Sequence, residues 1–251
     1  MVLDRTNVDT SNGFKMNGRA IRLFPTHVSE FFAEDEDFFK ELVRAENRIG
    51  SIPDELNLAT VPNITSSYGC RQIRFKLSDY LPDPDKTDAL NYEWEDDEWI
   101  SVRNSVCASF MAISKIYIEQ HFKNYDFDFN PIVNNLYVQD MWVVRYQQGD
   151  YNYFHNHPNA VLTSALFLEV PPQIHHEKNF PDGYLSLIGD TVYDESTLRF
   201  SKQAFIKPEV GKMVVFPASL GHQVYPFKGE GTRKVVSVNW GRNYQEKIKR
   251  T

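Results

Sequence analysis

Short apolar runs separated by turn residues fill the second half of the chain. From residue 136 onward, β-branched and aromatic residues dominate stretches that Gly, Pro and Asn interrupt, as in "LYVQDMWVVRYQQG", "NAVLTSALFLEVP", "GYLSLIG", "GKMVVFP" and "RKVVSVNW". Each stretch predicts a strand, and several strands in succession with few helix signals between them predict a sandwich or a barrel.

The first half of the chain has a different pattern. The stretch "EWISVRNSVCASFMAISKIYIEQHFK", residues 98–123, places apolar and small residues near helical spacing and predicts a long helix packed on a sheet. We expect His121, near the C-terminal end of this helix, to be a solvated capping residue. A strand at Ala20–Phe24, a helix around Glu34–Arg48 and a strand at Arg71–Leu77 are also predicted.

Together these elements predict a mainly β, α+β fold. No flexible linker divides the chain, so we expect one domain over residues 1–251. Within it, residues 1–135 are expected to form a helical and irregular support region, whose helices brace a β-rich core at residues 136–242.

Composition limits the partners. The formal net charge of −7 argues against broad binding to nucleic acid or to anionic membranes. No stretch has the apolar length of a membrane span, and the polar N-terminus lacks the apolar centre of a secretory signal, so we expect a cytoplasmic protein. The two cysteines, Cys70 and Cys107, lie in different segments and are expected to be reduced thiols.

Two histidines stand two positions apart in "YNYFHNHPNA", residues 151–160. Side chains at i and i+2 of an extended segment project in the same direction, so His155 and His157 can face one point. His222, in a turn after the strand expected at residues 212–216, can supply a third ligand. Three protein ligands leave coordination positions open, as a reactive metal requires. A His-x-His pair alone is a weak signal, since surface loops often contain one.

A candidate anion-binding residue follows His222. Arg233 opens the strand "RKVVSVNW", and alternation places Arg233, Val235, Ser237 and Asn239 on one face. A buried guanidinium needs an anionic partner and is suited to grip a carboxylate through two parallel hydrogen bonds. A metal and a carboxylate can therefore share one cavity, although Ser237 and Asn239 are equally compatible with hydrogen bonds inside the sheet.

The segments "RYQQGDYNYFHNHPNAVLTSALFLEVP" and "KPEVGKMVVFPASLGHQVYPFKGEGTRKVVSVNW" resemble the Fe(II)- and 2-oxoglutarate-dependent oxygenases. The resemblance covers residues 136–242 and is greatest to a branch common in phage and marine microbial genomes, distantly similar to prolyl hydroxylases. It implies a double-stranded β-helix, also called a jelly roll or cupin-like fold, with iron at its open end. A phage-encoded protein would work in the host cytoplasm.

The resemblance also implies roles for single residues. His155 and His222 match the two histidine ligands of iron, and His157 stands where most of the superfamily has Asp or Glu. Arg233 matches the residue that pairs with the distal carboxylate of 2-oxoglutarate, and Tyr146 resembles a tyrosine that binds this cosubstrate. Ser237 and Asn239 are expected to line the same face. Asn159 is a further candidate ligand, and a second family tyrosine is replaced by Leu166 or Phe167.

The function implied is an Fe(II)- and 2-oxoglutarate-dependent dioxygenase that hydroxylates its substrate, with succinate and CO2 as co-products. Its partners are 2-oxoglutarate, dioxygen and a substrate that the sequence does not identify: a peptidyl proline, another protein side chain or a small metabolite. Two alternatives stay open, a three-histidine dioxygenase that does not use 2-oxoglutarate and a non-catalytic jelly-roll binding module. The sequence predicts no oligomeric state.

Overall fold

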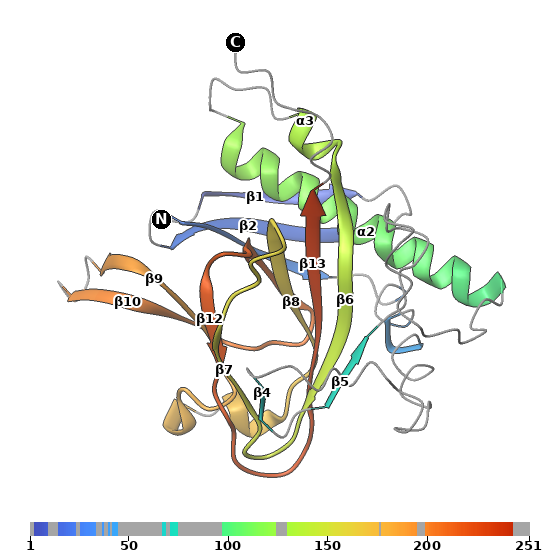
Figure 1. Cartoon of the computed structure of the whole chain (residues 1–251). Coiled ribbons are helices and arrows are strands. Elements are labelled where there is room, and N and C mark those ends of the chain that lie inside the picture. The colour runs from blue at the N-terminus through green and yellow to red at the C-terminus, as the bar shows by residue number, and fades with distance from the viewer. Residues whose placement is uncertain are drawn as a thin grey trace.

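The computed structural model contains two antiparallel sheets that face each other (Figure 1). It describes residues 3–9, 15–23, 26–33, 37, 40, 42–44, 67–68, 71–74, 97–123, 130–175, 177–194 and 199–242. None of the helices in these ranges is long and apolar enough to cross a membrane.

The larger sheet has eight strands and the smaller has five. The larger has the order β1 (Leu3–Asp9), β2 (Lys15–Leu23), β3 (Thr26–Ala33), β11 (Lys212–Pro217), β8 (Leu162–Glu169), β13 (Arg233–Arg242), β6 (Leu136–Tyr146), β5 (Arg71–Arg74). The smaller has the order β10 (Arg199–Ile206), β9 (Leu185–Asp194), β12 (Gly221–Val224), β7 (Tyr151–His155), β4 (Ser67–Tyr68).

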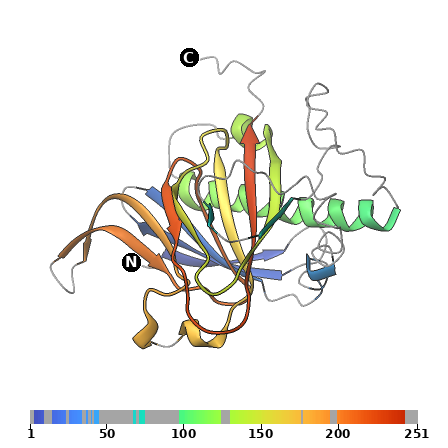
Figure 2. The same ribbon diagram turned by 60° about the horizontal axis from the view of Figure 1, so that its bottom comes forward.

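Eight of these strands form the predicted jelly roll. β6, β8, β11 and β13 are neighbours in the larger sheet, while β7, β9, β10 and β12 are neighbours in the smaller one. The chain therefore crosses between the sheets repeatedly, and strands far apart in sequence become partners. β7 pairs with β12, for example, and this pairing sets His155 opposite His222. The β9–β10 hairpin extends away from the other strands in both views (Figures 1 and 2).

The long helix predicted at residues 98–123 is confirmed as α2 (Asp97–Phe122). It lies across the larger sheet (Figure 2) and packs on the face turned away from the smaller sheet. The buried cluster there joins α2 residues, among them Phe110 and Ile113, to Val236, Val238 and Trp240 of β13. The shorter helices are α3 (Asn130–Val133) and two 3-10 turns, η2 (Pro172–His175) and η3 (Glu177–Asn179).

His121 is not the solvated residue expected from its place near a helix end. It is 6% exposed, and its ring packs against Tyr117 and His27. Its Nε2 lies 2.8 Å from the hydroxyl of Ser29 on β3. The strand β3 covers this end of the helix, which the helix sequence alone does not reveal.

The N-terminal region contributes more strand than expected. β1, β2 and β3 extend the larger sheet, and β3 pairs directly with the core strand β11. The strand predicted at Ala20–Phe24 overlaps the longer β2 at residues 20–23, and the strand predicted at Arg71–Leu77 overlaps β5 at residues 71–74. Residues 24 and 75–77 lie outside the described ranges. Thus the support region is built from strands as well as from α2.

Two N-terminal predictions have mixed outcomes. In the helix expected around Glu34–Arg48, residues 37, 40 and 42–44 are described and helical. Leu42 is buried, whereas its neighbour Val43 is 41% exposed. Cys107 is buried, and Cys70 lies outside the described residues.

A second buried cluster fills the space between the two sheets. It includes Val144, Phe167, Leu187, Phe216 and Val235, which point away from α2. Because side chains alternate along each strand, β6, β8 and β13 supply one set of residues to the helix side and the other set to the space between the sheets. The candidate site lies in this second space.

Candidate metal centre and cosubstrate cavity

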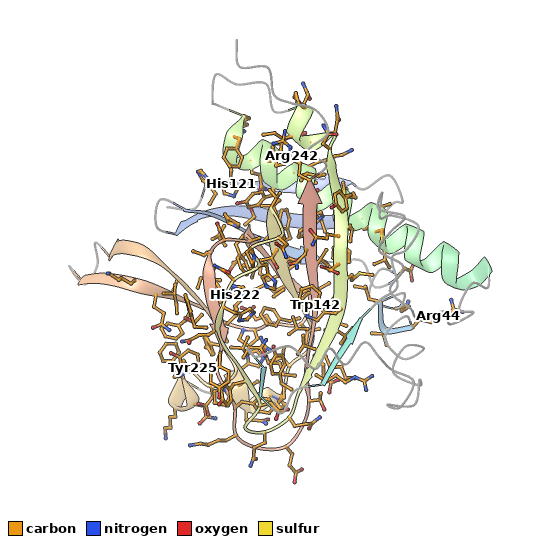
Figure 3. The ribbon with its side chains drawn as sticks, in the orientation of Figure 1. Arg44, His121, Trp142, His222, Tyr225 and Arg242 are labelled. Atoms are coloured by element: carbon orange, nitrogen blue, oxygen red, sulfur yellow. The ribbon has the colours of Figure 1, made fainter. Side chains whose placement is uncertain are left out.

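Three histidine side chains converge between the sheets. His155 ends β7, His157 follows it in the next loop, and His222 lies on β12. One nitrogen from each ring lies within 4.8 Å of the others, and His157 Nε2 is 3.3 Å from His222 Nε2. Figure 3 labels His222 on the β12 side and Trp142 across from it on the β6 side. The structure thus brings together the three ligands predicted from the sequence.

The remaining ring nitrogens of two histidines face backbone acceptors. His155 Nδ1 lies 2.7 Å from the carbonyl of Tyr153, and His222 Nδ1 lies 3.0 Å from the carbonyl of Leu220. A carbonyl only accepts hydrogen bonds, so each Nδ1 carries the proton and donates it. The Nε2 atom of each ring is then left with a lone pair, the form that binds a metal.

His157 is held differently. Its Nδ1 lies 3.3 Å from the side-chain amide of Asn239, and its backbone N–H donates to the carbonyl of Ala218 at 2.8 Å. Asn239 is 6% exposed, and its Oδ1 has no hydrogen-bond partner among the described residues. The ring of His157 also packs beside the indole of Trp142, with ring centroids 5.8 Å apart.

Burial keeps these histidines neutral. It lowers the pKa of His157 to about 4, with a smaller contribution from His155. Burial also lowers the pKa of His155, and that of His222 falls well below its usual value because burial adds to the effect of the two neighbouring rings. Neutral imidazoles are ready to bind a cation without first losing a proton.

The floor of the cavity consists of four rows of side chains from paired strands. From the buried end to the open end, the rows are Arg233–Tyr146, Val235–Val144, Ser237–Trp142–Ala165 and Asn239–Asp140–Thr163. The open end adjoins Asn156 and Asn159, exposed residues of the loop that carries His157. The cavity that these rows and the histidines enclose has a volume of about 480 Å³.

Arg233 closes the buried end. Its side chain is 1% exposed, and its guanidinium carbon lies 4.7 Å from the ring centre of Tyr146 and 5.1 Å from that of Phe167. Stacking on two aromatic faces favours a cation and holds the planar guanidinium in place. Arg233 and the three histidines line the same cavity.

All seven site residues predicted from the sequence line this cavity: Tyr146, His155, His157, His222, Arg233, Ser237 and Asn239. Asn159 also lines it. Of the two residues expected in place of a second tyrosine, Phe167 stacks on Arg233, whereas Leu166 packs in the cluster beside α2. His175 is exposed, and His176 lies outside the described residues.

Asp140 and Trp142 also line the cavity and were not singled out in the sequence. Both share a face of β6 with Tyr146, because Asp140 lies six positions and Trp142 four positions before it. The alternation of side chains along this predicted strand therefore indicated that both residues face the same way as Tyr146. Thr163 joins them from β8, where it lies opposite Asn239.

Comparison with known families gives one match. Residues 140–239 match the family model described as "Putative 2OG-Fe(II) oxygenase", where 2OG is 2-oxoglutarate. This confirms the family resemblance, and the three-histidine group able to hold a metal agrees with the iron in the family's name. The narrower phage and marine branch stays a prediction.

Two similar solved structures are a Pseudomonas putida prolyl-4-hydroxylase and a Burkholderia pseudomallei oxidoreductase of the 2OG-Fe(II) oxygenase family. The first is 17% identical with a TM-score of 0.45, over 83% of this chain and 88% of that one. The second is 11% identical with a TM-score of 0.48, over 81% and 80%. No curated protein matches the sequence.

Proposed function

Starting from the match of residues 140–239 to this oxygenase family, we propose that the chain is an Fe(II)- and 2-oxoglutarate-dependent dioxygenase. It hydroxylates its substrate and releases succinate and CO2. The observation that carries the proposal is the meeting of three neutral imidazoles and one buried guanidinium in a single cavity. We also propose that residues 1–251 act as one domain, because β3 and β5 complete the sheet that forms the cavity floor.

The three histidines fit a divalent metal. Imidazole nitrogen suits iron as well as zinc, copper and nickel, and three ligands leave positions for a cosubstrate and dioxygen. His157 takes the place of the usual carboxylate, so the ligand set is uncharged. In return, the lowered pKa values of the histidines keep them available as ligands below neutral pH.

Asn239 supports the ligand that departs from the family pattern. The two ends of an amide have nearly the same shape, and turning the Asn239 amide by half a turn places Oδ1 beside His157 Nδ1. Oδ1 then accepts the Nδ1 proton, which satisfies the buried oxygen and leaves His157 Nε2 with its lone pair. All three histidines then have the same tautomer, with an acceptor behind each ring.

Arg233 and Tyr146 hold the cosubstrate at the buried end. The guanidinium of Arg233 pairs with the distal carboxylate of 2-oxoglutarate through two hydrogen bonds, in a geometry that its stacking on Tyr146 and Phe167 fixes. The apolar row formed by Val235 and Val144 lies between this anchor and the polar rows. It surrounds the carbon chain of the cosubstrate and keeps water away.

Iron and 2-oxoglutarate, when bound, supply the oxidation chemistry, in which the reduction of dioxygen is coupled to the loss of CO2 from 2-oxoglutarate. One oxygen atom of dioxygen enters succinate, and the other is inserted into a substrate C–H bond. The chain contributes ligands, orientation and exclusion of water. The substrate that we propose is a peptidyl proline, another protein side chain or a small metabolite.

The test combines binding with product analysis. Protein reconstituted anaerobically with Fe(II) should bind 2-oxoglutarate and, on exposure to dioxygen with candidate substrates, form succinate. Arg233→Glu should abolish 2-oxoglutarate binding while metal binding remains. Lys234→Glu is the matched control, since Lys234 neighbours Arg233 in the strand and pairs on the surface with Glu169 at 2.9 Å.

The outcomes separate the alternatives. Metal binding with oxygen consumption but no 2-oxoglutarate requirement would favour the three-histidine dioxygenase. A protein that binds neither metal nor 2-oxoglutarate would favour the non-catalytic module. Either result would refute the proposed function.

A further inference from the structure

The cavity carries opposite charges at its two ends. Arg233 occupies the buried end, and Asp140 lies in the row at the open end, where its strand partner is Asn239. Arg233 and Asp140 are the two residues among those lining the cavity that are charged when its histidines are neutral. If 2-oxoglutarate pairs with Arg233, the carboxylate of Asp140 is left facing the space where a substrate enters.

Asp140 has little to balance its charge. Its side chain is half-buried, and its described hydrogen bond is a long one of 3.5 Å from the amide of its neighbour Gln139. None of the described lysines or arginines forms an ion pair with it. A partly desolvated carboxylate without a cation is unfavourable, and a cationic partner would offset that cost.

Trp142 stands beside this carboxylate. It lies two residues along β6 from Asp140, so both side chains point from the strand into the cavity. Indole is the aromatic ring that attracts cations most strongly over its face. Thr163 and Asn239, in the same row as Asp140, add a hydroxyl and an amide that can accept hydrogen bonds.

We propose that the substrate carries a cationic nitrogen, an ammonium or guanidinium group, and that Asp140 and Trp142 bind it at the cavity mouth. This inference rests on the proposed dioxygenase function. Asn239, the strand partner of Asp140, also contacts the candidate ligand His157, so the cation binds close to the metal. The carbon that is hydroxylated therefore lies a few bonds from the charged nitrogen, as in a lysine or arginine side chain or a small amine.

The competing explanation for Asp140 is electrostatic. Three neutral ligands lack the negative charge that a carboxylate ligand brings, and a nearby Asp140 could compensate for it. The two explanations differ in what Asp140→Asn disturbs. A substrate-binding carboxylate affects substrate alone, whereas a compensating carboxylate affects the metal and 2-oxoglutarate.

The first experiment identifies the product class. Protein loaded with Fe(II) and 2-oxoglutarate is incubated under 18O2 with a tryptic peptide mixture and, separately, with a mixture of free amino acids and amines, and mass spectrometry locates the label. We expect the label in lysine or arginine side chains, free or within peptides, or in the amines that are not amino acids. Label found only in other side chains overturns the inference but leaves the proposed function intact. If no label and no succinate form with any of these mixtures, the proposed function fails, and this inference with it.

The second experiment compares Asp140→Asn with the unmodified protein on the substrate that gives the labelled product. We expect kcat/KM for that substrate to fall by at least about 30-fold, as for loss of one partner of a desolvated charge pair. Affinities for Co(II) and for 2-oxoglutarate should stay within twofold of the unmodified protein. Trp142→Leu should raise KM, and Glu169→Gln, which removes an exposed carboxylate of the same sheet, should change nothing. A tenfold loss of Co(II) or 2-oxoglutarate affinity in Asp140→Asn would overturn the inference in favour of charge compensation.

Discussion

Replacing Asn239 by leucine should weaken metal binding while the protein stays folded. The amide of Asn239 lies 3.3 Å from Nδ1 of His157. Leucine has a similar size but cannot accept a hydrogen bond from this Nδ1. His157 then loses the partner that holds its Nε2 lone pair toward the metal. Loss of such a supporting hydrogen bond costs about 10- to 100-fold in metal affinity, or roughly 1.4–2.8 kcal/mol.

The metal-free protein should respond less. Leucine removes a buried amide whose Oδ1, in the orientation of the structure, has no partner among the described residues, which favours the variant. It also leaves Nδ1 of His157 without its partner at 3.3 Å, which disfavours the variant. Because these two effects oppose each other, we expect the free energy of unfolding of the metal-free Asn239→Leu protein to lie within about 2 kcal/mol of that of the unmodified protein.

The assay is a competition titration of Zn(II) or Co(II) against a chromophoric chelator at fixed pH, combined with imidazole 15N NMR of the zinc-loaded protein. Asn239→Asp is the control, because a carboxylate also accepts the Nδ1 proton and should preserve or raise the affinity. Equal metal affinity in the leucine variant and the unmodified protein would refute the reasoning. An aspartate variant as weak as the leucine variant would do the same.

Three further predictions concern the site and the fold. His222→Ala should reduce the metal content of purified protein to background, as measured by elemental analysis, because it removes one of three converging ligands. The metal-free protein should lose stability as pH falls from 6.5 toward 4, because His157 takes up a proton in the unfolded chain but not in its buried place in the folded protein. The lowered pKa of about 4 limits the contribution of His157 to this loss to ~3 kcal/mol. His157→Gln should therefore flatten the pH dependence of the unfolding free energy, measured by chemical unfolding. Glu209→Leu should lower the unfolding free energy by about 1–3 kcal/mol because it leaves the ammonium of Lys212, which is 4% exposed, without its ion-pair partner, whereas Lys212→Met should cost less than 1 kcal/mol.

Local pattern was sufficient for the residues that one strand or one loop presents together. Alternation along "RKVVSVNW" predicted that Arg233, Ser237 and Asn239 share a face, and all three line the cavity. The i, i+2 spacing predicted that His155 and His157 point the same way, and their ring centroids lie 5.3 Å apart. In each case neighbours along the chain are also neighbours in space. Alternation of side chains along an extended segment is therefore enough to predict which of them share a face.

Long-range pairing was not readable in the same way. His222 meets His155 because β12 pairs with β7, a contact between segments far apart in the chain. The residues alone made His222 a candidate third ligand, and the resemblance to a known family implied its role as an iron ligand. His121 failed for a related reason: its position near a helix end suggested solvent, but β3 covers it and Ser29 bonds its ring. No pattern inside the helix reports on a strand that packs over it.

The alternation of β13 also separates stability from chemistry. Val236, Val238 and Trp240 are buried against α2, while the residues between them face the cavity. A strand with helix packing on one side can present polar and charged groups on the other, because the apolar area buried beneath α2 offsets the cost of placing Arg233 and Asn239 in a partly closed space. This explains why α2 matters for the site, although none of its described side chains lines the cavity. It allows the opposite face of β13 to remain polar.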